Sequence, residues 1–129
     1  TLMDNTTRPP GKTTVATNVL LSIARLTTLQ VEGVSRMHQF PGGVNRIFHK
    51  GDYGDGVHIK IEDDRVFANI HVVLKNGVNI REVSRTIQHE VKRALSEMVG
   101  MEVGRINVHI ENIDYPVDSV EPLEEPDTE

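Results

Sequence analysis

The strongest constraint on the fold is a pair of adjoining periodic segments in the second half of the chain. Residues 65–74 read RVFANIHVVL, and every second side chain from Val66 to Leu74 is apolar. That period of two is typical of a strand with one buried face. From Ile80 to Met98 the apolar residues instead recur every three or four positions, which predicts a helix with one apolar stripe. Each segment has an apolar side to bury, so we expect them to pack against one another.

The ends of this second helix carry recognisable signals. Asn79 is a favourable N-cap, and Glu82 stands three residues later, where a capping box places an acidic or amide side chain. Gly100 follows the last apolar residues, as a terminating glycine does.

The remaining elements are predicted from the same two periods. An earlier helix is expected over Val15–Leu29, with Thr13 or Thr14 as its cap. Its expected core face consists of Val15, Ala16, Val19, Leu20, Ile23, Ala24 and Leu26. Further strands are expected at Val34–Met37, Val57–Ile61 and Ile106–Ile110, with Gly33 in a turn before the first of them and a turn at Glu62–Asp64 that joins two strands into a hairpin.

The order helix, strand, hairpin, helix, strand indicates an α+β fold. We expect the two helices to pack on one face of a small, mainly antiparallel sheet, which leaves the other face open. The chain of 129 residues suits one core. We therefore interpret residues 1–11 as a flexible leader, 12–115 as one domain and 116–129 as a disordered acidic tail.

Composition excludes several classes of function. The chain contains no cysteine, which rules out disulfides, thiolate zinc sites and thiol nucleophiles, and is consistent with a cytoplasmic protein. No apolar run approaches the roughly 20 residues of a membrane-spanning helix, so direct membrane insertion is not expected. The net charge of -5 arises from the acidic end of the chain, so charge alone argues neither for nor against nucleic acid. The basic residues of the second helix are interleaved with glutamates, as on a solvated face, and nucleic-acid binding is not expected.

The stretch GKTT at Gly11–Thr14 is similar to the end of a phosphate-binding loop. Such a loop needs a glycine five residues before its second glycine, where this chain has Thr6, and it follows a buried strand. Pro9 and Pro10 also lack two of the backbone amides that would hold a phosphate. We predict no nucleotide site and no bound cofactor.

Two groups are candidates for a metal site. Glu62, Asp63 and Asp64 could suggest a cation or acid/base catalysis, but we interpret them as a turn. The second group is the histidines on the expected open face. Their positions in the alternating strands place His58, His71 and His109 away from the core. Three imidazoles at matching register would suit zinc or nickel, although no carboxylate is obviously placed to orient them. The alternative interpretation is a polar sheet face used for packing or self-association, and we prefer it.

The connection His38–Gly56 is long for a compact domain and contains basic and aromatic residues. Such a segment is the best place to look for contacts with a partner. The candidate partner contacts are Arg46, Phe48, Lys50 and Tyr53 in this connection, together with His71 and His109 on the open face.

Two blocks of the chain resemble the alkaline shock protein family, the Gls-type envelope stress response proteins. The first block is GKTTVATNVLLSIARLTTLQVEGVSRM, and the second runs from GVHIKIEDD through VVLKNGVNIREV to VGRINVHIENI. The resemblance covers roughly Gly11 to Ile113, and the ordered series of motifs carries it. Arg81 departs from the proline common in relatives, and the segment Phe40–Gly56 is idiosyncratic.

The resemblance implies a non-enzymatic cytoplasmic protein that self-associates. Relatives lie under the membrane through a separate anchor partner, and some bear on envelope stress or lipid synthesis. We therefore expect a self-associating scaffold in the envelope stress response that binds a protein partner. The alternatives are a regulatory subunit of a biosynthetic enzyme, such as one of lipid synthesis, and a metal-dependent enzyme using the three strand histidines.

Overall fold

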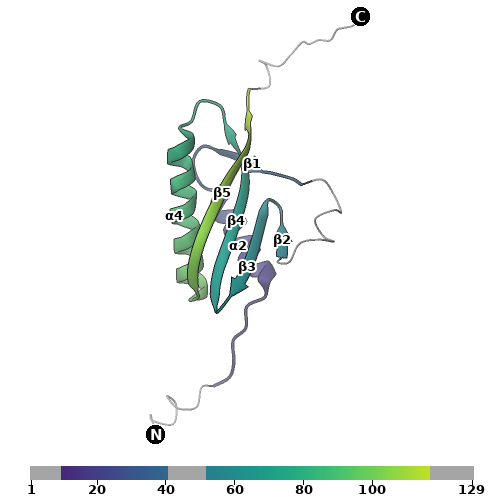
Figure 1. Cartoon of the computed structure of the whole chain (residues 1–129), viewed down its shortest axis with the longest axis vertical. Helices are drawn as coiled ribbons and strands as arrows, with labels where there is room; N and C mark the ends of the chain where they lie inside the picture. Colours follow the sequence, from purple (N-terminus) through teal and green to yellow (C-terminus); the bar gives the residue numbers. More distant parts are fainter. Residues whose placement is uncertain (1–9, 41–51, 117–129) are drawn as a thin grey trace, which may run out of the picture.

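The structure, a computed structural model, describes residues 10–40 and 52–116. Its elements, in chain order, are α2 (Thr17–Leu29), β1 (Val34–Met37), β2 (Asp52–Gly54), β3 (Val57–Glu62), β4 (Arg65–Lys75), α4 (Ile80–Val99) and β5 (Glu102–Asp114). All five strands belong to one sheet (Figure 1).

Strand β4 lies at the centre of the sheet and pairs with three other strands. β5 runs parallel to β4 along its whole length and fills one side of β4. The other side of β4 is divided between two antiparallel strands, because β3 pairs with residues 65–70 and β1 pairs with residues 72–74. β2 then extends the sheet beyond β3.

His71 marks the point at which the edge of β4 passes from β3 to β1. Its backbone N–H donates to the carbonyl of Gly56 at 2.7 Å, and its carbonyl accepts from the N–H of His38 at 2.9 Å. Gly56 has a φ of +72°, and a Cβ atom there would lie 2.7 Å from the His71 oxygen. Glycine is therefore required at this junction for both conformational and steric reasons.

The apolar face of β4 forms the middle of the core. Val66, Ala68, Ile70, Val72 and Leu74 are completely buried, as the alternation predicts. α2 contacts β1, β2 and β3, α4 contacts β5, and the two helices contact each other (Figure 1). The predicted α+β class, with helices on a mainly antiparallel sheet, is confirmed.

The predicted ends of α4 are confirmed. The Asn79 side-chain oxygen accepts from the backbone N–H of Glu82 at 3.0 Å. At the other end Gly100 adopts a left-handed conformation, with a φ of 80°, and its N–H donates to the carbonyl of Ser96. Between them Val83, Ile87, Val91 and Leu95 form the buried stripe, whereas Ile80 and Met98, at the two ends, are exposed.

The predicted cap and core face of the first helix are wrong in part. Its N-cap is Ala16, which makes no side-chain cap bond, so neither Thr13 nor Thr14 serves. The buried residues are Leu20, Leu21, Ala24 and Thr28. Val15 and Ala16, which we expected on the core face, are exposed and precede the helix. Val19 and Leu26, which we also expected in the core, lie on the helix and are exposed. The reason is that this helix has apolar residues on two sides, and spacing alone does not say which side faces the sheet.

The connection His38–Gly56 contains a strand that the sequence analysis missed. β2 pairs with β3, so that Asp52 lies opposite Ile59 and Gly54 opposite Val57. The sequence Asp55-Gly56 before a strand is a strong hairpin signal and could have revealed it. The turn at Glu62–Asp64 is confirmed, since Asp63 and Asp64 both have positive φ, as a two-residue hairpin turn of type I′ requires.

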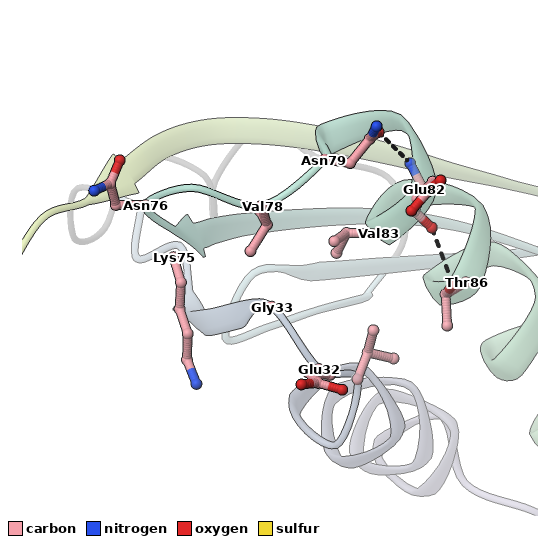
Figure 2. A pocket seen from close by; sticks show the side chains of 10 residues that line it. Glu32, Gly33, Lys75, Asn76, Val78, Asn79, Glu82, Val83 and Thr86 are labelled. Carbon is pink, nitrogen blue, oxygen red and sulfur yellow. Dashed lines mark hydrogen bonds between the residues drawn. The ribbon is translucent and has the colours of Figure 1, made fainter.

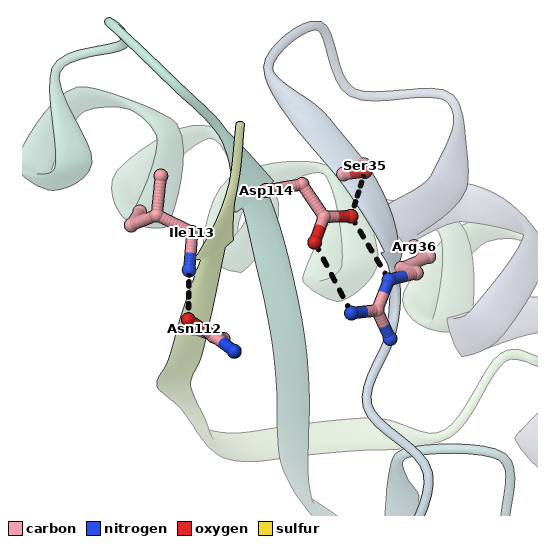
Figure 3. A network of polar contacts seen from close by, with 5 residues as sticks. All are labelled: Ser35, Arg36, Asn112, Ile113 and Asp114. Atoms are coloured by element: carbon pink, nitrogen blue, oxygen red, sulfur yellow. Dashed lines mark hydrogen bonds and ion pairs between the residues drawn. The ribbon is translucent and has the colours of Figure 1, made fainter. Parts of the chain in front are cut away.

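A cluster of polar bonds joins the end of β5 to β1, across the end of β4 (Figure 3). Asp114 accepts from Arg36 Nε at 2.9 Å and Nη2 at 3.1 Å, and from Ser35 Oγ at 2.7 Å. The hydrogen bonds from Arg36 lower the pKa of Asp114 most, and the bond from Ser35 lowers it further. We call these three residues the Asp114 clasp.

We predict that Gly56→Ala destabilises the protein far more than Gly77→Ala does. Both glycines have positive φ, but the space around Gly77 is open, whereas the Gly56 Cβ would strike the His71 carbonyl. The expected losses in the free energy of unfolding are about 3 kcal/mol for Gly56→Ala and about 1 kcal/mol for Gly77→Ala. Urea denaturation of both variants measures them, and equal losses would contradict the role of the junction.

Candidate interaction site on the open sheet face

Two histidines on neighbouring strands form the centre of the candidate site. His71 on β4 and His109 on β5 are partners in the sheet register. Their rings stack with centroids 4.5 Å apart and an angle of 13° between their planes. The sequence analysis placed both on the open face, and the structure brings them into contact there.

Hydrogen bonds hold each of the two rings in place. His71 Nδ1 lies 2.8 Å from Glu111 Oε2, and His109 Nε2 lies 3.1 Å from Asn69 Oδ1. The same Asn69 oxygen also accepts from Asn107 Nδ2 at 3.2 Å. An ionised carboxylate only accepts, so His71 donates through Nδ1. In the neutral rings this leaves His71 Nε2 and His109 Nδ1 as acceptors for an incoming donor.

Glu111 is the residue that the sequence analysis failed to find as a partner for these histidines. It lies two positions after His109 on the same strand, and this spacing, which usually places two residues on one face of a strand, was the available signal. The strand pairing is irregular here: Val72 pairs with Ile110, and the next residue, Val73, pairs with Asn112. Glu111 is therefore an extra residue of β5 with no register partner in β4.

Aromatic contacts extend the site beyond the two strands. Phe40 packs edge-on against His71 with centroids 4.8 Å apart, and His38 packs edge-on against Phe40 at 5.0 Å. The segment that follows β1 therefore covers one side of the histidine pair. We call His38, Phe40, Asn69, His71, His109 and Glu111 the histidine cluster.

The protonation of the cluster follows from its burial and its charges. Burial lowers the pKa of His109, and His71 lowers it further, against an opposing effect of Glu111. The hydrogen bond from His71 lowers the pKa of Glu111. The neutral form of His109 and the ionised form of Glu111 are thus the ones that the fold favours.

The other predicted site residues are not part of this cluster as defined, although His58 borders it. His58 on β3 is the register partner of Asn69, which lies two residues before His71 on β4. Tyr53 is part of β2, opposite His58. Arg46, Phe48 and Lys50 lie outside the described residues. In the described ranges 10–40 and 52–116, no group of three or more His, Asp or Glu side chains is arranged to hold a metal ion.

A hollow of about 550 Å³ lies at the N-terminal end of α4 (Figure 2). Its walls come from the turn before β1, the end of β4 and the first turns of α4, and they carry the charged residues Glu32, Lys75 and Glu82. Asn79 and Thr86 in its lining are already bonded to the backbone of Glu82. The lining offers hydrogen bonds but no nucleophile beside a base.

None of the helices in the described part of the chain is both long and apolar enough to span a membrane.

We predict that His109 makes the protein less stable as the pH falls below about 6.5. Its pKa is lower in the folded chain than the ordinary value of 6.5, so the unfolded chain binds protons more readily in this range. His109→Gln, whose side chain can still donate to Asn69, should flatten the dependence between about pH 7.5 and 5.5. Glu111, also with a lowered pKa, contributes only below its ordinary value of 4.5.

The measurement is urea denaturation across this range, with His89→Gln on α4 as the matched control. His89 is exposed on the outer side of the helix. If His109→Gln kept the full pH dependence while His89→Gln removed it, the assignment to His109 would be wrong.

Comparison with known proteins places this fold in a family. The sequence model of the alkaline shock protein family, described as having a cell envelope-related function, matches residues 5–115. YqhY of Bacillus subtilis (strain 168) is 31% identical over 114 residues, which are 88% of this chain and 84% of that protein. Spy1535 of Streptococcus pyogenes serotype M6 is 36% identical over 109 residues, 84% of this chain and 83% of that protein.

Among solved structures, the MamM CTD C267S variant aligns with a TM-score of 0.48 at 10% identity, over 78% of this chain and 100% of that one. The family match confirms the resemblance drawn from the sequence motifs, and the chain belongs to the alkaline shock protein family, whose described function is related to the cell envelope.

Proposed function

We propose that this protein is a non-enzymatic scaffold of the envelope stress response, which associates with itself and binds a protein partner through the open face of its sheet. A membrane-anchored protein is the partner we favour, with the chain on the cytoplasmic side. The domain would span residues 12–115, between a flexible leader and an acidic tail.

The observation that carries the proposal is the histidine cluster on the open face. In the described part of the chain both helices pack on the other face, so the cluster has no helix over it. His71 is nevertheless largely shielded, with a side-chain exposure of 17%, because Phe40 and His109 pack against it. Side chains fixed in this way lose little freedom when a partner binds, which favours association.

The chemistry of the face suits recognition of a polar protein surface. It brings together ring nitrogens that accept hydrogen bonds, the carboxylate of Glu111 and the ring of Phe40. The family's relation to the cell envelope supports the same function. Arg46, Phe48, Lys50 and Tyr53 remain proposed contacts beside His71 and His109.

We predict that the mass in solution grows with protein concentration. Light scattering should give masses above the 14.4 kDa of one chain, and metal analysis of the same sample should find no stoichiometric metal. A mass of one chain at every concentration would overturn self-association and favour the regulatory-subunit alternative, in which the chain forms a defined complex with an enzyme. Stoichiometric metal would overturn the non-enzymatic assignment.

A further inference from the structure

Three exposed cations of helix α4 share one side of the helix. A turn of about 100° per residue places Arg81, Arg85 and Lys92 within about 40° of one another around the helix axis. In the described part of the chain none of the three takes part in an ion pair. We call these three residues the α4 ridge.

The acidic residues of α4 do not neutralise this ridge. Although they are interleaved with the cations in the sequence, Glu82, Glu90 and Glu97 are centred about 120° away around the axis. Glu90 is paired with Arg93 at 3.0 Å, and Arg93 lies on the acidic side. Positive and negative charge are therefore separated on the surface of this helix.

The ridge is an unfavourable arrangement of charge unless an anion lies beside it. Arg81 and Arg85 are four residues apart, a spacing at which like charges repel on a helix. Arg81 is also the second residue of α4, where the helix dipole disfavours a cation. An anion bound along the ridge would relieve both effects.

The ridge runs along the side of α4 that lies next to β5. Gln88 borders the ridge on the helix surface, and its side chain donates to the carbonyl of Ile106 on β5 at 3.0 Å. β5 ends at the end of the molecule at which α4 begins (Figure 1). There the carbonyl of Asp114 accepts from the N–H of Asn76, in the connection between β4 and α4, at 3.0 Å. The chain that continues from β5 therefore starts beside the first turns of α4.

That continuation carries the charge that the ridge lacks. Residues 117–129 contain no lysine or arginine, and we call them the acidic segment. Its acids are Asp118, Glu121, Glu124, Glu125, Asp127 and Glu129. The ridge from Arg81 to Lys92 is about 16 Å long at 1.5 Å per residue. Since an extended chain covers about 3.3 Å per residue, the acidic segment is long enough to lie along the whole ridge.

We propose that the acidic segment docks on the α4 ridge of its own chain and shields this ridge from other polyanions. Exposed ion pairs are individually weak, which disfavours a dilute partner. A segment tethered beside the ridge has instead an effective concentration on the order of millimolar. The contact is intramolecular, so it does not depend on the self-association proposed above.

A spin label on the acidic segment tests the docking in the full chain. The chain has no cysteine, so Thr128→Cys accepts one nitroxide label. At low salt the label should broaden the backbone amide resonances of residues 85–92. In about 1 M salt, where the screening length is about 3 Å, the broadening should fall at least about threefold.

Two charge variants show whether the ridge is responsible. In the ridge variant all three ridge residues are changed to glutamine, and the low-salt broadening should fall to its high-salt value. The matched control removes the same charge from three other exposed cations and should keep the broadening: Lys12→Gln, Lys60→Gln and Arg93→Gln.

Shielding is tested with heparin as the probe polyanion. Glu121→Gln, Glu124→Gln and Glu125→Gln together should strengthen heparin binding about tenfold on the control background. On the ridge-variant background the same three changes should have no effect, because the surface they uncover has lost its charge.

Two results would overturn the proposal. The first is equal broadening in the ridge variant and the control, or an equal gain in heparin binding on both backgrounds, because either would mean that net charge alone is acting. The second is broadening in a mixture of spin-labelled chains with unlabelled, isotope-enriched chains, because the acidic segment would then reach a second copy and not its own helix.

Discussion

The architecture depends on how the two edges of β4 are filled. One edge is taken completely by β5, so β1 and β3 must share the other and meet end to end at His71. That meeting is possible because Gly56 lets the chain approach the His71 carbonyl more closely than any Cβ would allow. The side chain of the same residue then points to the open face, where it stacks on His109. The bonds that complete the sheet and the contacts that build the candidate site therefore meet at one residue.

Much of this fold could be predicted from local periodicity and capping chemistry. The strand at β4, the helix at α4 with its Asn79 and Gly100 ends, and the turn at Asp63 and Asp64 each have a pattern with one physical interpretation. The α+β class followed from their order. β2 was missed, because a strand of three residues is too short to show the alternation of a strand. The signal that indicates it is the Asp55-Gly56 turn.

The candidate site was predictable in part. Alternation put His71 and His109 on the open face, but their contact depends on the parallel register of β4 and β5, which follows from the α4 crossover and is not a local property. The bond of Glu111 to His71 depends on the irregularity after Ile110. The core face of α2 was assigned wrongly in part, for a different reason. Val15, Val19 and Leu26 are apolar at helical spacing, and a pattern with two apolar sides contains no information about which side the sheet covers.

The Asp114 clasp also has a mechanical consequence. The segment that leads into α2 and the end of β5 extend toward opposite ends of the long axis, and β5 runs along that axis beside β4 (Figure 1). Tension between these ends would pull β5 lengthwise along β4, so that their hydrogen bonds would share the load instead of opening one after another. The bidentate hydrogen bonds from Arg36 to Asp114 lie at the end of β5, where that load enters the sheet. A pull between the two ends of the domain would thus act on the sheet in its more resistant direction.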